Sequence, residues 1–103
     1  MLVLKEEVFG PIAPVIAARS EQDTIRIANA TEFGLGAAIW TRDISKAERL
    51  AKEVACGFLS INGLVKSDPR LPFGGVKKSG FGRELSHFGL KEFVNIETIV
   101  ICG

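Results

Sequence analysis

Residues 37–62 read AAIWTRDISKAERLAKEVACGFLSIN, and this stretch decides the fold class. Its first five residues are mostly apolar and do not alternate with polar ones, which predicts a buried strand over 37–41. Asp43 then suits the N-cap of a helix, whose apolar positions recur at helical spacing at Ile44, Ala47, Leu50, Ala51 and Val54. Gly57 would end this helix, and residues 58–62 predict a second strand.

The residues before this stretch repeat the pattern. Residues 15–18 form a short apolar run behind two prolines, which predicts another strand. Ser20 and Asp23 resemble a capping box, and the apolar stripe that follows predicts a helix ending near residue 30. The order is therefore β-α-β-α-β, which is typical of an α/β fold with a parallel sheet covered by helices.

The composition limits the class of protein. The chain has 103 residues, enough for one domain, and its 13 Lys+Arg against 12 Asp+Glu give a net charge of +1. This balance argues against a general binder of nucleic acid or of membrane surfaces. Hydrophobic residues make up 47% of the chain, which indicates an apolar face that another surface covers. We find no secretory signal and no apolar run near the roughly 20 residues of a membrane span, so we expect a cytoplasmic protein.

A long glycine-containing loop follows at residues 63–82, and loops of this length are usually functional. Five cations stand against one aspartate over residues 66–83, with two phenylalanines among them. The pattern suits either a solvated basic loop or a site for an anion or single-stranded nucleic acid. Residues 84–93 predict a short helix, and the β-branched residues 94–101 predict a terminal strand that would pair with another subunit.

Few residues of this chain suit nucleophilic or metal chemistry. Cys56 and Cys102 each lie among apolar neighbours, which predicts buried or half-buried thiols. His87 is the only histidine, so neither a zinc site nor a Ser-His-Asp triad is expected. The glycine-rich segment 34–39 lacks the third glycine of a dinucleotide fingerprint. The segment 75–80 is not followed by the lysine of a phosphate loop.

Five motifs nevertheless occur in the order and spacing of NAD(P)-dependent aldehyde dehydrogenases, near the end of that family's chain. They are EVFGP at 7–11, GLGA at 34–37, Asn62, PFGG at 72–75, and Lys77 with SG at 79–80 and GRE at 82–84. The chain resembles the family from end to end, and most closely its bacterial succinate-semialdehyde branch. The resemblance implies that residues 1–93 are the C-terminal part of the catalytic domain and that 94–103 are an oligomerisation strand.

The resemblance also implies roles for particular residues. Glu7 would accept hydrogen bonds from the nicotinamide ribose, and Phe9 would pack against the nicotinamide end of the cofactor. Ser67 would help to hold the distal carboxylate of the substrate, and Phe73 would line the aldehyde funnel. Glu84 matches a glutamate that has been proposed to assist a proton relay in the family. The neighbouring Arg83 is expected to be structural, near a subunit contact.

The rest of the family's catalytic machinery lies N-terminal to the segment that this chain resembles. It comprises a cysteine nucleophile, a glutamate base and a Rossmann-like domain, and neither Cys56 nor Cys102 matches the nucleophile. We therefore expect part of a homo-oligomeric enzyme that oxidises an aldehyde, expected to be succinate semialdehyde, with NAD or NADP. The 103 residues alone would be inactive. The alternatives are a truncated interaction module without catalysis and a small binder of anions or single-stranded nucleic acid.

Overall fold

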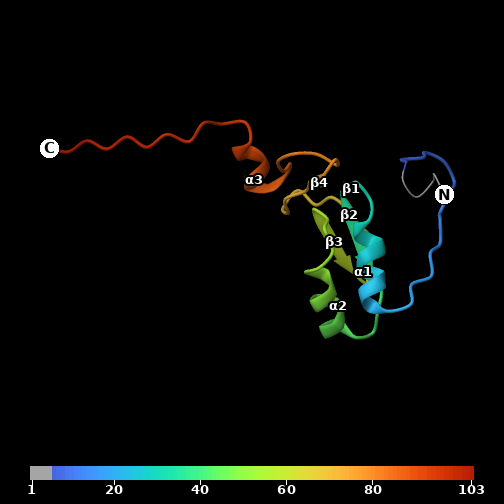
Figure 1. Ribbon diagram of the computed structural model, residues 1–103. Coiled ribbons are helices and arrows are strands. Elements are labelled where there is room, and N and C mark those ends of the chain that lie inside the picture. The colour runs from blue at the N-terminus through green and yellow to red at the C-terminus, as the bar shows by residue number, and fades with distance from the viewer. Residues whose placement is uncertain (1–5) are drawn as a thin grey trace.

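Short helices and strands alternate in the structure, a computed structural model that describes residues 6–103 (Figure 1). Along the chain they are α1 (Glu21–Asn29), β1 (Phe33–Gly34), β2 (Gly36–Ile39), α2 (Ile44–Ala51), β3 (Phe58–Ile61), β4 (Val76–Lys77) and α3 (Ser86–Lys91). The mixture of helix and strand confirms the α/β class. The expected β-α-β-α-β order is present only from α1 onward, because no strand precedes that helix in residues 6–20.

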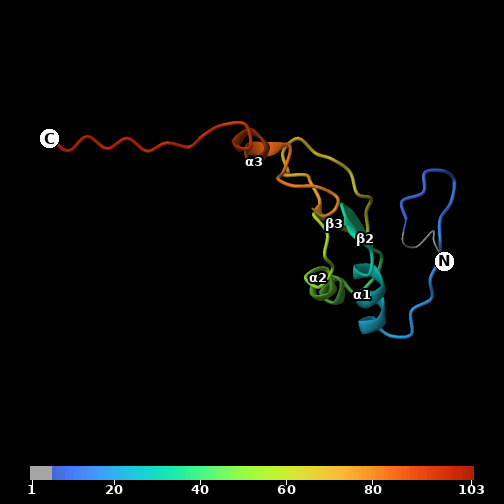
Figure 2. The ribbon, with the colours of Figure 1, turned by 45° about the horizontal axis from the view of Figure 1, so that its top comes forward.

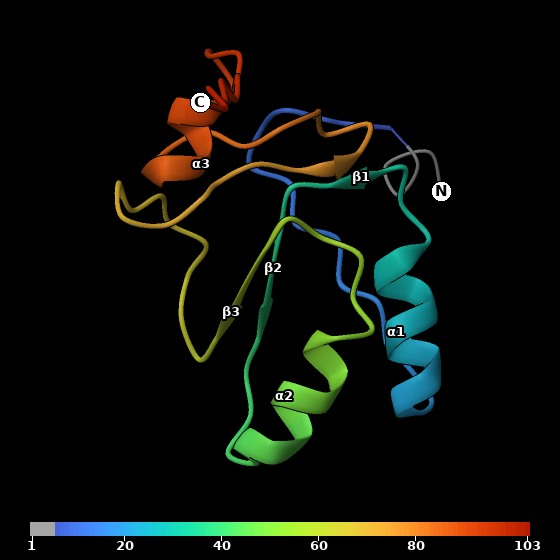
Figure 3. The ribbon, with the colours of Figure 1, turned by 90° about the vertical axis from the view of Figure 1, so that its left-hand side faces the viewer.

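A parallel β-α-β unit forms the centre of the structure. Strands β2 and β3 pair in parallel, with Gly36 opposite Phe58 and Ile39 opposite Ile61, and α2 connects them. Helices α1 and α2 lie side by side next to this pair (Figure 3). Glu21 of α1 forms ion pairs with Lys46 and Arg49 of α2, which fixes the two helices to each other.

The starts of both long helices were predicted correctly, because each is capped by a side chain three residues away. The hydroxyl of Ser20 accepts a hydrogen bond from the Asp23 N–H at 3.1 Å. The carboxylate of Asp43 accepts one from the Lys46 N–H at 2.9 Å. These bonds satisfy N–H groups that have no partner within the helix.

We expect Asp43→Ala to lower the free energy of unfolding of the chain by about 1 kcal/mol, since it removes the cap of α2. Urea unfolding followed by far-ultraviolet circular dichroism would measure the change. Asp43→Asn keeps an acceptor at the same position and should be nearly neutral. Equal losses in the two variants would contradict the capping role.

The predicted end of α2 was wrong. The helix stops at Ala51, six residues before Gly57, because the side chain of Asn29 takes the next backbone groups. Its amide nitrogen donates to the Glu53 carbonyl and its amide oxygen accepts from the Ala55 N–H, both at 2.8 Å. This pair of bonds ties the end of α1 to the segment that enters β3.

Asn62 closes the carboxyl ends of the two parallel strands. Its side-chain oxygen accepts from the Thr41 N–H at 2.9 Å and its nitrogen donates to the Thr41 carbonyl at 2.8 Å. The backbone of Asn62 has a φ of 54°, a left-handed conformation that asparagine tolerates better than most residues. A second, antiparallel pair joins β1 to β4, with Phe33 opposite Lys77.

Two predicted strands do not form in this chain. Residues 15–18 and 94–101 belong to no ladder, and their side chains are exposed. A strand needs a partner for its backbone groups, and no described strand lies beside either segment. The C-terminal segment extends away from the rest of the structure (Figure 2). The expectation that residues 37–41 are buried was also wrong, since no residue of β2 is buried.

The described residues have almost no hydrophobic core of their own. Ala47 is the only fully buried apolar side chain among residues 6–103, whereas Phe9, Trp40, Phe81 and Ile101 are largely exposed. The radius of gyration is 17.8 Å, compared with about 13 Å for a compact domain of this length. The uncovered apolar face expected from the composition is therefore present. None of the helices in residues 6–103 is long and apolar enough to cross a membrane.

Candidate functional site

Phe73 and Glu84, both singled out by the sequence, face each other across a closed loop. The Phe73 N–H donates to the Glu84 carbonyl at 2.9 Å, and the Glu84 N–H donates back to the Phe73 carbonyl at 2.7 Å. At the base of the loop, the Ser86 N–H donates to the Pro69 carbonyl at 3.0 Å. The Glu84 side chain is exposed and that of Phe73 is half-buried.

Phe73 lies in an open groove of about 350 Å³, held from two sides. Its ring packs on Phe58 of β3 with the ring centres 5.9 Å apart. Arg83 crosses the loop and donates from Nη1 to the carbonyls of Gly75, at 2.9 Å, and Gly82, at 2.6 Å. These contacts fit the structural role expected of Arg83.

Gly57 explains how closely this loop approaches β3. A Cβ atom at Gly57 would lie only 1.7 Å from the carbonyl oxygen of Gly74 and 3.0 Å from Cα of Gly75. Only glycine allows two backbones to come this near. Gly57, assigned above to a helix cap, instead permits the backbone contact that positions the Phe73 loop.

Glu7 borders a second open groove, of about 450 Å³. The other lining residues are Thr31, Phe33, Gly34, Leu35, Gly36, Lys78 and Ser79. The carboxylate of Glu7 is exposed and has no hydrogen bond or ion pair within residues 6–103. Leu35 and Ser79 also line the Phe73 groove, so the two grooves are neighbours that share a wall.

The structure does not bring all the predicted site residues together. Phe9 is 92% exposed, and Ser67 is exposed in the loop before α3. Neither lines the Glu7 groove or the Phe73 groove. The first groove therefore places Glu7 beside the β1–β4 pair, and the second contains both Phe73 and Glu84. Phe9 and Ser67 lie outside both grooves.

Most cations of the basic loop are bound within the chain. Lys78 pairs with Glu32 at 2.6 Å and Arg70 pairs with Asp68 at 2.7 Å. The hydrogen-bonding Arg70 guanidinium holds the pKa of the Asp68 carboxyl below its usual value. The ammonium of Lys77 donates to two backbone carbonyls, and Arg83 does the same with its guanidinium. An anion site built from this loop is therefore less favoured than the sequence suggested.

The two thiols differ in their surroundings. Cys56 is half-buried, as expected, whereas Cys102 is exposed because the terminal segment has nothing packed against it. Burial raises the pKa of the Cys56 thiol, which disfavours the thiolate that a nucleophile requires. The structure shows no cluster of three metal-ligating side chains in residues 6–103.

Alkylation by iodoacetamide should therefore modify Cys102 before Cys56. The thiolate is the reactive form, so a raised pKa leaves less of it at a given pH and shifts the rise in Cys56 labelling to higher pH. Labelling rates measured by mass spectrometry in Cys102→Ser and Cys56→Ser variants would separate the two thiols. Rapid labelling of Cys56 near neutral pH would contradict this assignment.

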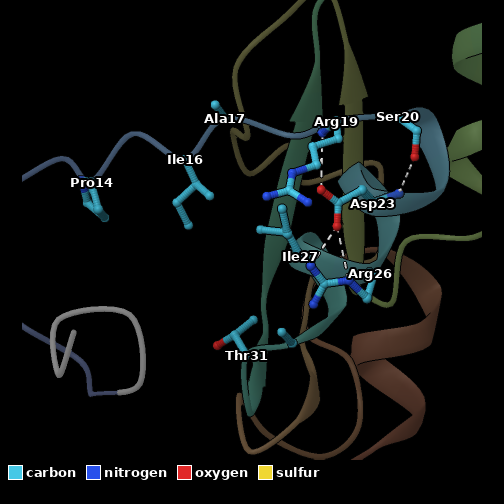
Figure 4. Close-up of a pocket in the computed structure, with 10 residues that line it drawn as sticks. Pro14, Ile16, Ala17, Arg19, Ser20, Asp23, Arg26, Ile27 and Thr31 are labelled. Carbon is cyan, nitrogen blue, oxygen red and sulfur yellow. Dashed lines mark hydrogen bonds and ion pairs between the residues drawn. The ribbon is translucent and has the colours of Figure 1, made fainter.

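A further groove, of about 880 Å³, lies between the N-terminal segment and α1 (Figure 4). Asp23 is its acidic residue, and its carboxylate already accepts hydrogen bonds from the Arg19 N–H and the Arg26 guanidinium. The pKa of Asp23 is lowered chiefly by the Arg26 guanidinium. Neither Glu7 nor Phe73 lines this groove, so it is separate from the predicted site residues.

Comparison with known proteins decides the family. Residues 1–99 match the aldehyde dehydrogenase family. The chain belongs to this family. It is 52% identical over 99 residues to the succinate semialdehyde dehydrogenase Sad of Escherichia coli. It is 50% identical over 101 residues to a succinate-semialdehyde dehydrogenase of Mycobacterium bovis. The matches cover 96% and 98% of this chain but only 21% and 22% of those relatives, so the chain spans about a fifth of their length.

Solved structures of family members agree with the fold. Gox0499 superposes with a TM-score of 0.92 at 47% identity, over 97% of this chain and 22% of that one. Betaine aldehyde dehydrogenase of Staphylococcus aureus in complex with NAD+ superposes with a TM-score of 0.87 at 41% identity, over 90% of this chain and 18% of that one. The arrangement of these helices and strands is therefore shared with family members of several-fold greater length.

Sequence reasoning missed the long-range contacts of the residues that support this part of the structure. Asn29, Gly57 and Lys77 act through contacts with segments far away in the chain. The one available signal was that Lys77 stands in the fifth family motif. Such a motif marks a position without saying what its side chain touches.

Proposed function

We propose that this chain is the C-terminal part of the catalytic domain (residues 1–93) and the oligomerisation strand (94–103) of an aldehyde dehydrogenase. The enzyme would oxidise succinate semialdehyde to the carboxylate with NAD or NADP. The observation that carries the proposal is the shared wall of the Glu7 and Phe73 grooves at Leu35 and Ser79. Hydride transfer needs the aldehyde and the nicotinamide next to each other, and two adjoining grooves meet that need.

The residues at the first groove fit the ribose portion of a dinucleotide. The Glu7 carboxylate is exposed and has no partner in the described residues, so both oxygens can accept hydrogen bonds from hydroxyl groups. The bound dinucleotide would supply the hydride acceptor. In this proposal Phe9 packs against its nicotinamide end, which requires the N-terminal segment to fold back from its exposed position.

The second groove would orient the aldehyde. Phe73 provides an apolar wall whose position is fixed by Phe58 and by the backbone bridge to Glu84. Ser67 would reach the distal carboxylate of succinate semialdehyde from the preceding loop. Glu84 would take part in a proton relay. Its side chain is exposed to solvent, so it can exchange protons with water.

We further propose that these 103 residues do not turn over substrate alone. The half-buried Cys56 has a raised pKa, and Cys102 lies on an exposed segment with no base beside it in the described structure. A thiol attack on an aldehyde needs a thiolate held next to its substrate. The nucleophile and the base would be supplied by the upstream part of the enzyme.

Completing the chain tests the proposal. Fusing it in frame behind the upstream part of the E. coli relative, roughly four fifths of that protein, gives what we call the completed enzyme. The completed enzyme is expected to produce NAD(P)H with succinate semialdehyde, faster than with betaine aldehyde, while the 103 residues alone produce none. Turnover by the chain alone would refute its predicted inactivity. A folded but inactive completed enzyme would overturn the proposed function.

A non-catalytic interaction module is the second candidate, and one observation favours it. The segment 94–101 is exposed, apolar and unpaired, so it can add to a sheet edge of another chain. Size-exclusion chromatography with light scattering separates the outcomes. A dimer or larger oligomer that is lost on Ile99→Lys would support pairing through this segment. A stable monomer would contradict it.

A further inference from the structure

We propose that Lys77 is a positioning residue that holds the Glu7 groove in place beside the Phe73 groove. This inference rests on the proposed function, because it assigns the Glu7 groove to the dinucleotide. It concerns a side chain that lines neither groove. Lys77 would therefore act through the backbone that it holds.

The ammonium of Lys77 lies at the C-terminal end of α1. Its Nζ donates to the carbonyls of Asn29 and Thr31, each at 3.0 Å. The last carbonyls of a helix have no partner within it and carry its negative dipole end, so a cation is favourable there. Lys77 has a φ of 57°, which is uncommon for a residue with a side chain, so the surrounding contacts must maintain this conformation.

Lys77 belongs to a short turn, residues 77–79, that is fastened to the segment 29–34. The Lys78 N–H donates to the Glu32 carbonyl at 3.0 Å, and the Ser79 hydroxyl accepts from the Gly34 N–H at 2.9 Å. The strands β1 and β4 have only two residues each, too few to hold a ladder by themselves. The contacts of this turn therefore set the distance between the two segments.

Those same two segments make the wall of the Glu7 groove. Every lining residue other than Glu7 comes from 31–36 or from 78–79. The Phe73 groove has further supports, since Arg83 and the Phe73–Glu84 bridge hold it independently. Loosening the turn at Lys77 should therefore disturb the Glu7 groove, proposed for the dinucleotide, more than the Phe73 groove, proposed for the aldehyde.

The test compares Lys77→Met, Lys77→Arg and Lys52→Met in the completed enzyme. Lys52 is a matched control because it also stands at the end of a helix, α2, yet its ammonium makes no hydrogen bond or ion pair in residues 6–103. We expect Lys77→Met to raise KM for NAD(P)+ by about tenfold, with KM for the aldehyde changed less than about twofold. Lys77→Arg keeps donors at the carbonyls and should restore most of the affinity.

A rise in KM for NAD(P)+ without an equal rise in KM for the aldehyde distinguishes a positioning role from a simple loss of stability. A variant that only folds less well lowers the amount of active enzyme and therefore kcat, and it leaves both KM values unchanged. Hydrogen exchange by mass spectrometry gives a second measurement that needs no turnover. The segments 29–36 and 76–79 should exchange faster in Lys77→Met than in the parent or in Lys52→Met.

Each outcome decides one part of the inference. Unchanged exchange in Lys77→Met would show that the lysine does not hold the two segments. Faster exchange with unchanged KM values would make Lys77 structural only and overturn the positioning role. If Lys77→Met exchanges faster than the parent as predicted, but the parent completed enzyme fails to reduce the dinucleotide, the proposed function fails. The exchange data would still decide whether Lys77 fastens the turn.

Discussion

Replacing Gly57 by alanine in the completed enzyme should reduce kcat/KM by about a hundredfold or more. The added Cβ would lie 1.7 Å from the backbone carbonyl oxygen of Gly74. No side-chain rotation can relieve this contact, because the backbone of residue 57 fixes the position of the Cβ atom. The Phe73 loop must then move away from β3, and the contact between the Phe73 and Phe58 rings is lost with it. We expect a loss of about 3 kcal/mol or more in the free energy of unfolding as well.

Gly103→Ala is the control for this substitution. A Cβ at Gly103 would meet no atom within 4 Å, so the same chemical change should leave activity and melting temperature unaltered. Steady-state kinetics with succinate semialdehyde and thermal unfolding measure both properties. A Gly57→Ala enzyme that keeps at least half of the parent activity would contradict the close approach of these two backbones.

Changing Glu7 to glutamine should lower kcat/KM for NAD(P)+ by about ten- to a hundredfold in the completed enzyme. A hydrogen bond to a charged group contributes about 1.5–3 kcal/mol, and each 1.4 kcal/mol corresponds to about a factor of ten. Glutamine keeps the size of the side chain, so the change removes the charge and one acceptor without opening a cavity. Initial rates at varied NAD(P)+ concentrations measure the effect.

Glu6→Gln provides the matched control, since Glu6 is the exposed neighbour and lines none of the grooves described above. It should change kcat/KM less than about twofold. Equal effects of the two substitutions would point to the general negative charge of this segment. An unchanged Glu7→Gln enzyme would refute the assignment of the Glu7 groove to the dinucleotide.

Local sequence signals predicted the parts of the fold that depend on neighbouring residues. Ser20 and Asp43 cap their helices through N–H groups three residues away, and a pattern of that length is visible in the sequence. The parallel pairing of β2 and β3 followed from the helix between them. The end of α2 could not be predicted, because Asn29 determines it from 24 and 26 residues away.

The strands that failed to form share one physical cause. Residues 15–18 and 94–101 have strand-forming sequences, but a strand forms only beside a partner edge. For residues 94–101 the expected partner is another subunit, so pairing of this segment stays a prediction. The prediction that Cys102 is buried or half-buried was wrong for the same reason, since an apolar neighbourhood in the sequence gives burial only when another layer covers it.

The candidate site was predicted only as separate positions. The family resemblance indicated Glu7, Phe9, Ser67, Phe73 and Glu84, and their roles stay predictions. What the sequence could not show is the shared wall at Leu35 and Ser79, or the contacts of Lys77 with carbonyls 46 and 48 residues away. These contacts form only in the folded chain, where glycine residues allow short segments to approach one another closely.

In our proposal this chain works as the closing segment of a longer aldehyde dehydrogenase. The near-absence of a core in residues 6–103 and the match to about a fifth of the relatives' length support it. The most direct measurement is the DNA sequence upstream of the Met1 codon. We predict an open frame that encodes a Rossmann-like domain, a glutamate base and a cysteine nucleophile. A stop codon followed by a translation start immediately before Met1 would contradict the claim.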